Sequence, residues 1–285
     1  MPLAARLFYN TTKEYNMGND VTIAIPVWNV EPYVAAAVES ALTQTYPNTQ
    51  IMIIDDCGTD RSMEIVERKI GEHHAKDRVQ IIRHPENKGL GEARNTAIYN
   101  TDTDYLYFLD SDDMMQPGAI ERLMAVALAT NADITTGGTL FYNEDMTTRS
   151  VYAEMPRMTI TTPHAGIYLT AYAAPRLNTE AWGKLYKTSL FNDNNIQTVH
   201  PILEDVMLWM QTAYYAGTVA TIPDFVHQYR RRRGSICRTP WNTPERQAIL
   251  RKILADVKDF AARHPCLGMA EVKRRMGGIL DGKMH

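Results

Sequence analysis

The chain has 285 residues, enough for one large domain or a domain with an appendage, built around a sizeable core. Its 45% hydrophobic and 22% charged residues are typical of a globular protein. A formal net charge of −3 gives no indication that the partner is nucleic acid, and no apolar run in the sequence is long enough to span a bilayer.

The cysteines and the first residues of the sequence bear on the cellular compartment. Cys57, Cys237 and Cys266 are an odd number without a CxxC spacing, which argues against a zinc site or a disulfide framework. Residues 1–20 are polar and lack the apolar core of a secretion signal, so we expect them to form an irregular arm. Reduced thiols without a signal predict a cytoplasmic protein.

Residues 21–109 alternate between short apolar runs and stretches with apolar residues at helical spacing. One such stretch places Val34, Val38 and Leu42 on one face of a helix. The alternation is typical of βαβ units and predicts an α/β fold, with a mostly parallel central sheet flanked by helices. The expected elements are a strand at 21–25 stopped by Pro26, a helix begun at Pro32 and closed by Pro47, a strand at 51–54, a helix at 63–70, a strand at 79–82, a helix at 92–99 and a strand at 105–109.

The pattern is looser after residue 114. Basic residues at 273–275 would suit a membrane-surface or partner helix, but the apolar face of the last predicted helix suits packing on its own domain, which we favour. The expected elements are a helix at 119–130, a short strand at 134–136, a loop or edge hairpin at 143–162, a helix at 206–216 and a final helix through 249–260.

Two of the predicted strands run directly into acidic residues. The strand at 105–109 is followed by Asp110, Asp112 and Asp113, three carboxylates within four residues. Carboxylates that close repel one another unless a cation neutralises them, and Mg²⁺ or Mn²⁺ prefers such oxygen ligands. A solvated helix cap is the alternative, but parallel sheets bind ligands at the carboxyl ends of their strands. The sequence therefore favours a divalent metal site here.

Asp55 and Asp56 follow the strand at 51–54 and should lie beside the first cluster at the same sheet edge. They could simply be acids of a turn that Gly58 allows to bend. They could instead accept hydrogen bonds from a nucleobase imide or a ribose hydroxyl. The residues alone leave both interpretations open.

Eight short motifs follow one another along the chain. In this order they closely resemble the family-2 glycosyltransferases, which implies a Rossmann-like GT-A fold, a nucleotide-sugar donor and inversion at the transferred sugar. Cys57 and Gly58 depart from the Gly-Ser that is more usual there, a change that a turn of small residues tolerates. The motifs are 26–29 (PVWN), 54–60 (IDDCGTD), 87–89 (NKG), 93–95 (ARN), 109–113 (LDSDD), 182–187 (WGKLYK), 203–206 (LEDV) and 228–236 (QYRRRRGSI).

The resemblance also implies roles for individual residues. It assigns the nucleoside base to Asp55 and Asp56, and the divalent ion, Mn²⁺ or Mg²⁺, to Asp110 and Asp112. Uridine is the favoured nucleoside. The donor-binding set that it implies is Pro26, Asn29, Asp55, Asp56, Lys88, Arg94, Asp110, Ser111, Asp112, Asp113, Arg232 and Arg233.

The acceptor side carries the implied catalytic base. Asp205 matches the base of the family, although acids at 204–205 could also be explained by the dipole of the helix that follows. Glu204 and Trp182 are expected to contact the acceptor, with a core position for Trp182 as the alternative. The basic run at 230–233 suits a flexible loop that closes over the diphosphate, because guanidinium groups match phosphate oxygens.

The expected organisation is an arm at 1–20, a GT-A domain at 21–238 and a C-terminal helical extension at 239–285. Within the domain, 21–118 would bind the donor and 119–238 the acceptor. The expected function is metal-assisted transfer of a sugar, from a nucleoside diphosphate to a glycan or lipid-linked hydroxyl, in polysaccharide biosynthesis. Such a protein would be cytoplasmic or peripheral at the inner face of the membrane, and its oligomeric state is not predicted.

Two other functions fit the same residues less well. A nucleotidyltransferase also places metal-binding acids on such a sheet, but it would have a glycine-rich loop where this chain has 26–29. A non-catalytic nucleotide-sugar or carbohydrate-binding protein would not need both Asp112 and Asp205.

Overall fold

A computed structural model describes residues 20–173, 179–200, 203–233, 235 and 243–280. The arm expected at 1–20 lies almost wholly outside these residues, as does Cys237. Within the described part of the chain, no helix has the length and apolar character needed to cross a bilayer.

The first half of the chain has the predicted alternation. Four parallel strands stand in the order β3-β2-β1-β4, and their residues are mostly buried because helices cover both faces of the sheet. The elements are β1 (Val21–Val27), α1 (Val34–Leu42), β2 (Thr49–Asp55), α2 (Ser62–Glu72), a 3₁₀ turn (Lys76–Arg78), β3 (Val79–Arg83), α3 (Leu90–Asn100) and β4 (Tyr105–Phe108).

The first strand continues through Pro26, where we predicted its end. Pro26 pairs with Ile54 of β2, and β1 ends at Val27. The ladder to β4 stops at the pair Ala24–Phe108, so the missing N–H of Pro26 removes no bond on that side.

The second half makes the sheet mixed. β9 lies antiparallel between β4 and β6, and β10 then runs parallel to β6. The prediction missed β9, α6 and β10, but the hairpin expected within 143–162 is present as β7, which pairs with β6. The elements are β5 (Met114–Met115), β6 (Ile134–Asn143), β7 (Arg149–Ala153), β8 (Met158–Thr161), β9 (Lys184–Lys187), α6 (Thr188–Asn194) and β10 (Thr218–Arg231).

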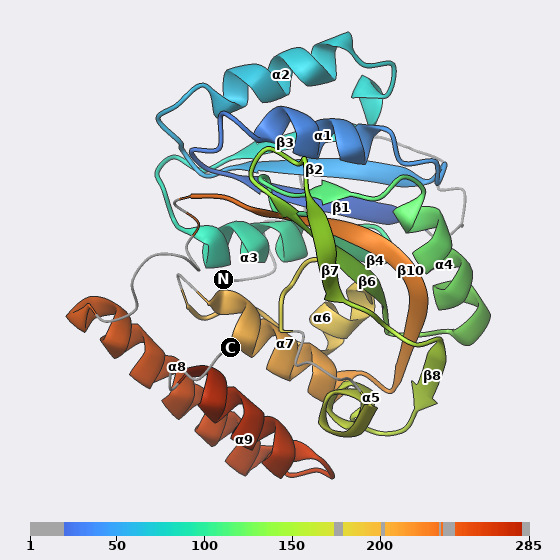
Figure 1. Ribbon diagram of the computed structural model, residues 1–285, viewed down its shortest axis with the longest axis vertical. Helices are drawn as coiled ribbons and strands as arrows, with labels where there is room; N and C mark the ends of the chain where they lie inside the picture. Colours follow the sequence, from blue (N-terminus) through green and yellow to red (C-terminus); the bar gives the residue numbers. More distant parts are fainter. Residues whose placement is uncertain (1–19, 174–178, 201–202, 234, 236–242, 281–285) are drawn as a thin grey trace, which may run out of the picture.

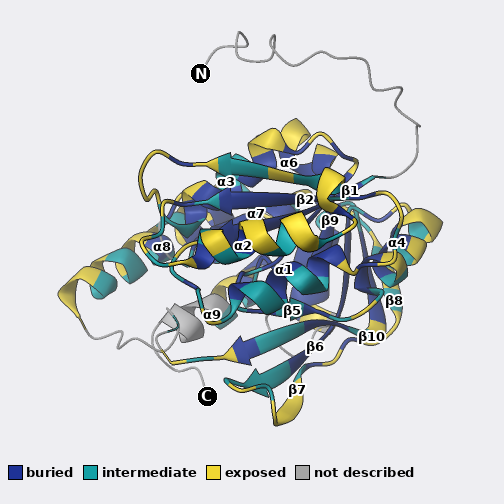
Figure 2. Ribbon diagram, turned by 90° about the horizontal axis from the view of Figure 1, so that it is seen from above, coloured by how far each residue is buried: buried dark blue, intermediate teal, exposed yellow. Residues whose placement is uncertain are grey.

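Two helical layers enclose the sheet (Figure 1). α1, α2 and α4 (Ala119–Thr130) share one apolar cluster with the sheet, and α3, α6 and α7 (Glu204–Tyr215) share another on the opposite face. Figure 2 shows the strands at the centre coloured as buried, while the outward faces of α2 and α4 are exposed. The sheet is therefore the core of a three-layer α/β structure.

A pair of glycines lets β10 pass close to β6. A side chain at Gly137 would meet the carbonyl oxygen of Asp224 at 2.6 Å, and one at Gly138 would meet the ring of Phe225 at 2.8 Å. The register between β6 and β10 shifts here, so β10 bulges before it continues toward the acidic cluster.

The C-terminal helices pack on the domain. Ile253 and Val257 of α8 are fully buried in a cluster with Val206 and Met210 of α7, which confirms the favoured interpretation of the final predicted helix. The basic residues at 273–275 lie on a further helix that was not predicted, beside α8 in Figure 1. The helices of this region are α5 (Ala165–Tyr168), continued by a π-helical turn (Leu169–Ala173), α8 (Pro244–Arg263) and α9 (Met269–Leu280).

Candidate active site

Three carboxylates gather where β4 ends. Oxygens of Asp110, Asp112 and Asp113 all lie within 4.8 Å of one another, as the sequence predicted. Asp113 is fully buried: one oxygen accepts the backbone N–H of Arg230 at 2.7 Å, and the other lies 3.0 Å from Nε2 of His227. Burial, and then the charges of the two neighbouring acids, raise the pKa of Asp113 well above its usual value. Asp113 is therefore the least available of the three as a ligand.

Asp112 is paired with a residue from the far end of the chain. Nε of Arg232 donates to Oδ2 of Asp112, and about a fifth of each side chain is exposed. Burial raises the pKa of Asp112 while Arg232 opposes that shift, and the nearby Asp110 carboxylate adds to it. A mobile cation could take the place of the guanidinium at this carboxylate.

Arg94 joins the acidic cluster to helix α7. Its buried guanidinium donates to Oδ1 of Asp110 at 2.7 Å and to Oε1 of Glu204. Glu204, expected to contact the acceptor, is itself buried, with that oxygen held by Arg94. The structure thus places Arg94 and Glu204 as a bridge between β4 and α7.

Asp205 follows Glu204 in the first turn of α7. Its Oδ1 atom is buried and has no hydrogen-bond partner among the described residues. Burial is the main cause that raises the pKa of Asp205 to about 6; Arg94 opposes the shift, and the carboxylates of Glu180 and Asp110 add to it. An unpaired carboxylate oxygen with a pKa this close to neutral can accept a proton.

The two acids after β2 differ in their surroundings. Asp56 is 2% exposed, and its carboxylate accepts from Nδ2 of Asn87 and from the backbone N–H groups of Lys88 and Gly89, and lies 2.6 Å from Nδ1 of His84. This one side chain therefore holds the loop that leads into α3.

Asp55 is more open to solvent. One of its oxygens accepts the backbone N–H of Cys57 at 3.1 Å, and the other faces the half-exposed Arg83 at 3.6 Å. Of the two acids, Asp55 has the carboxylate that a ligand could reach without breaking a buried network.

The other predicted donor-side residues surround the same edge. Pro26 is buried near the end of β1, and Asn29 accepts the backbone N–H groups of Thr59 and Asp60 through its side-chain oxygen. Ser111 is buried within the acidic turn. Lys88 is exposed.

The basic run differs from the flexible loop that we predicted, because β10 extends to Arg231. Arg230 is buried, and its guanidinium donates to the backbone carbonyls of Asp112 and Glu144. Strand alternation turns Arg231 outward. Arg230 is thus structural, and Arg232 is the arginine of this run whose guanidinium pairs with a carboxylate of the acidic cluster.

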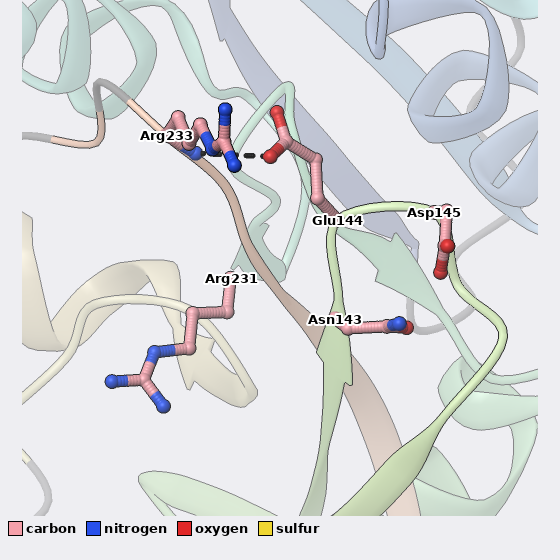
Figure 3. A pocket seen from close by; sticks show the side chains of 5 residues that line it. All are labelled: Asn143, Glu144, Asp145, Arg231 and Arg233. Carbon is pink, nitrogen blue, oxygen red and sulfur yellow. Dashed lines mark hydrogen bonds between the residues drawn. The ribbon is translucent and has the colours of Figure 1, made fainter.

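An open hollow of about 570 Å³ adjoins this region, between the tip of the β6–β7 hairpin and the end of β10 (Figure 3). Arg233 and Glu144 face each other across it, and the backbone N–H of Arg233 donates to Oε2 of Glu144 at 3.3 Å. The side chain of Arg231 points away from this pair. The hollow lies at the rim of the acidic site.

Trp182 lies in the interior with only 4% of its surface exposed. It stacks on His227 at 4.2 Å between ring centroids and on Tyr229 at 5.5 Å. His227 had been assigned no role from the sequence, yet it connects Trp182 to Asp113 and burial lowers its pKa to about 3. No sequence motif signalled this contact, because it depends on the bulges of β10.

The acidic cluster fits a divalent ion. Asp110 and Asp112 are partly exposed, offer hard oxygen ligands and lie beside a third carboxylate, while Asp113 has both oxygens engaged by the protein. Of the three, the pair predicted to hold the metal is thus the pair that the geometry leaves accessible.

Comparison with known proteins places this site in a family. The family model described as glycosyl transferase family 2 matches residues 22–193, which is more than half of the chain. The chain is 30% identical over 229 residues to the glycosyltransferase GlyA of Streptococcus pneumoniae, covering 76% of this chain but only 31% of GlyA.

Solved structures show the same fold at lower identity. S. aureus TarS residues 1–349 in complex with UDP-GlcNAc matches with a TM-score of 0.67 at 19% identity, covering 88% of this chain and 69% of TarS. The mannosyltransferase PcManGT from Pyrobaculum calidifontis, in complex with GDP-Man and Mn²⁺, matches with a TM-score of 0.55 at 15% identity, covering 94% and 84% of the two chains. The predicted GT-A fold is thereby confirmed.

Proposed function

Because the chain belongs to glycosyl transferase family 2, we propose that it moves a hexose or N-acetylhexosamine from a UDP-sugar to a hydroxyl of a glycan or lipid-linked acceptor, with inversion. The observation that carries this proposal is the environment of Asp205. This carboxylate has an unpaired, buried oxygen and lies within electrostatic reach of Asp110, so a proton acceptor stands beside a candidate diphosphate site.

The chemical step is a single displacement. Asp205 accepts the proton of the acceptor hydroxyl while that oxygen forms a bond to the anomeric carbon of the donor. The bond from this carbon to the diphosphate oxygen breaks with its electron pair, and UDP leaves. A positioned general base commonly contributes about 10²–10⁴-fold to the rate.

The leaving diphosphate needs positive charge. Asp110 and Asp112 would hold Mn²⁺ or Mg²⁺, which supplies electrostatic stabilisation of the diphosphate when bound. Arg232 is partly exposed and lies beside Asp112, so its guanidinium can turn toward phosphate oxygens. Arg94 keeps Asp110 oriented from the buried side.

Uridine is proposed as the nucleoside because the sequence motifs resemble enzymes that use it, and because a structural neighbour of this fold was solved with UDP-GlcNAc. Asp55 would accept a hydrogen bond from the base or the ribose, while Asp56 would hold the loop beside it. In this proposal residues 21–118 bind the donor, 119–238 bind the acceptor and 239–285 form an extension. We also propose a cytoplasmic protein of polysaccharide biosynthesis, with peripheral association at the inner face of the membrane as the resemblance to the family implies.

Donor binding can be tested by thermal shift with UDP-, GDP- and TDP-sugars, each with and without Mn²⁺. A ligand that binds the folded state raises the melting temperature by mass action. We expect a manganese-dependent rise with UDP compounds that Asp112→Ala removes and Asp102→Ala, an exposed acid before β4, leaves intact. No rise with any nucleotide would refute the donor site. Binding without sugar transfer to any acceptor would indicate the non-catalytic alternative.

A further inference from the structure

A group of partly buried aromatic side chains lies on the proposed acceptor side of the site. We define Phe141 of β6, Tyr152 of β7 and Tyr229 of β10 as the aromatic wall. We propose that the aromatic wall and Glu180 form the subsite for the pyranose ring of the acceptor. This inference rests on the proposed function, since it gives the sugar acceptor a place beside Asp205.

The rings of the aromatic wall pack on one another and on the core. The centroids of Phe141 and Tyr152 are 5.1 Å apart, those of Phe141 and Tyr229 are 5.0 Å apart, and those of Tyr152 and Tyr229 are 6.0 Å apart. Trp182 supports them from the interior, 6.0 Å from Tyr152. The wall is thus a rigid apolar surface that remains partly open to solvent.

A bulge in the β6–β7 hairpin sets the direction of Tyr152. Leu140 pairs with Val151, but the next residue back on β6, Thr139, pairs with Ala153. Tyr152 is therefore the extra residue of the strand, and a bulge at such a position redirects a side chain. Here the redirected ring faces Trp182 and Tyr229.

Glu180 supplies the polar part of the subsite. The hydroxyl of Tyr152 donates to its Oε1 atom, and its own backbone carbonyl accepts from Nζ of Lys184. Its Oε2 atom is buried and has no hydrogen-bond partner within the described residues. Leaving a buried acceptor unpaired costs about 1–3 kcal/mol, which a hydroxyl of a ligand would offset.

The position of Glu180 links the aromatic wall to the reacting hydroxyl. After burial, the Glu180 carboxylate is the foremost of the charges that raise the pKa of Asp205, so the two acids lie within electrostatic reach. A pyranose has an apolar C–H face and a rim of hydroxyls. With that face on Tyr152 or Tyr229, one hydroxyl can donate to Glu180 while another reaches Asp205.

The test is saturation-transfer NMR with methyl β-D-glucopyranoside, methyl β-D-galactopyranoside and methyl N-acetyl-β-D-glucosaminide, each with and without UDP and Mg²⁺. We expect saturation of the ring protons of at least one glycoside by the wild type. Tyr152→Ala should weaken its binding about tenfold or more, and Glu180→Gln and Tyr152→Phe should weaken it less. Tyr99→Ala, a change at an exposed tyrosine of α3, is the matched control and should bind like the wild type.

The outcomes separate this inference from the proposed function. If the wild type saturates no glycoside, or if Tyr152→Ala and Glu180→Gln both bind like the wild type, the subsite is refuted. If Tyr152→Ala does not fold, the test rests on Glu180→Gln and Tyr152→Phe, and wild-type binding by both would refute the subsite. Failure to bind UDP, measured separately by thermal shift, would count against the donor site. Even if UDP does not bind, the subsite is supported when the wild type binds a glycoside without nucleotide and Glu180→Gln does not.

Discussion

Asp56 and Asp205, two carboxylates of the candidate site, have opposite hydrogen-bonding surroundings. Asp56, after β2, lies within hydrogen-bonding distance of four polar groups and holds the loop that leads to α3. Asp205, at the start of α7, leaves one buried oxygen without a partner. Among buried polar groups such an orphan is rare, because it reduces the stability of the fold.

The difference indicates that an acid within a motif can serve either the fold or the chemistry. Its hydrogen-bond partners distinguish these two roles. A carboxylate that is saturated by its own protein stabilises one conformation. A carboxylate that is kept unpaired retains the capacity to accept a proton from a ligand. Substitutions at the two positions should therefore have opposite effects on stability and activity.

The largest effect is expected on catalysis. Asp205→Asn keeps the shape of the side chain but removes the proton acceptor, so we predict a loss in kcat of about 10²–10⁴-fold. The measurement is release of UDP in the presence of an acceptor, with UDP binding followed by thermal shift. Asp205→Asn that transfers sugar at the wild-type rate would show that Asp205 is not the base.

The next effect is on folding. Asp56→Ala leaves three donors of the loop and the buried His84 without an acceptor, and we predict a loss of about 3 kcal/mol in the free energy of unfolding. Asp55→Ala is the matched control, since Asp55 accepts one backbone N–H and faces a half-exposed arginine; it should cost about 1 kcal/mol or less. Urea denaturation of the two variants measures these losses in the free energy of unfolding. Equal losses for Asp56→Ala and Asp55→Ala would contradict the role of Asp56 in holding the loop.

Asp205→Asn should also stabilise the protein. The pKa of Asp205 is raised to about 6 from an ordinary value of 3.8, so the folded state binds the proton more tightly than the unfolded chain does. Its contribution to stability is present below the unfolded value and is lost as the pH rises through 6. We predict that Asp205→Asn melts about 2–4 °C above the wild type at pH 7.5.

The same variant supplies an internal check by pH. The gain in melting temperature should disappear at pH 4, where the carboxyl group is protonated in the folded protein. A gain that persists at pH 4 would indicate a packing effect in place of the relief of a buried charge.

The smallest effect is on the pH profile of the wild type. A base with a pKa of about 6 is protonated below that pH, so kcat should fall about tenfold for each further pH unit. Initial rates between pH 5 and 8 would show the inflection, and melting curves at each pH would confirm that the protein stays folded. A flat profile down to pH 5 would argue against a titrating base with this pKa.

The sequence predicted the first half of the molecule well. Each strand and helix between Val21 and Phe108 has its own apolar period, and the acids directly after β2 and β4 needed only the rule that parallel strands end at one edge. Because Asp110 and Asp112 are two residues apart in the sequence, their proximity in the structure could be predicted without any long-range contact.

The second half of the chain was less predictable because its contacts are long-range. β10 was missed since Pro223 and two register shifts interrupt its pattern, and those shifts bring His227 to Asp113. The basic charge of residues 230–233 was evident from the sequence. That Arg230 is buried and Arg231 exposed follows only from the alternation of side chains along a strand, which was not predicted there. Glu180 belongs to no motif, and its significance depends on where Tyr152 and Asp205 lie.

Among the strands that the structure describes, the β7 strand that carries Tyr152 is attached to the sheet along one side only, so it could be replaced by the corresponding strand of a relative. β7 pairs with β6, lies off the path of the main sheet and has its three outer residues exposed. Residues 145–153 could therefore be replaced, together with Tyr152, while Glu144 keeps its contacts with Arg230 and Arg233. On the proposed acceptor subsite, such a graft from a relative is expected to change the binding of the acceptor and to leave Asp55 and Asp110 in place. The part of the proposed subsite that β7 carries could thus be exchanged by itself, while Phe141, Tyr229 and Glu180 stay in place.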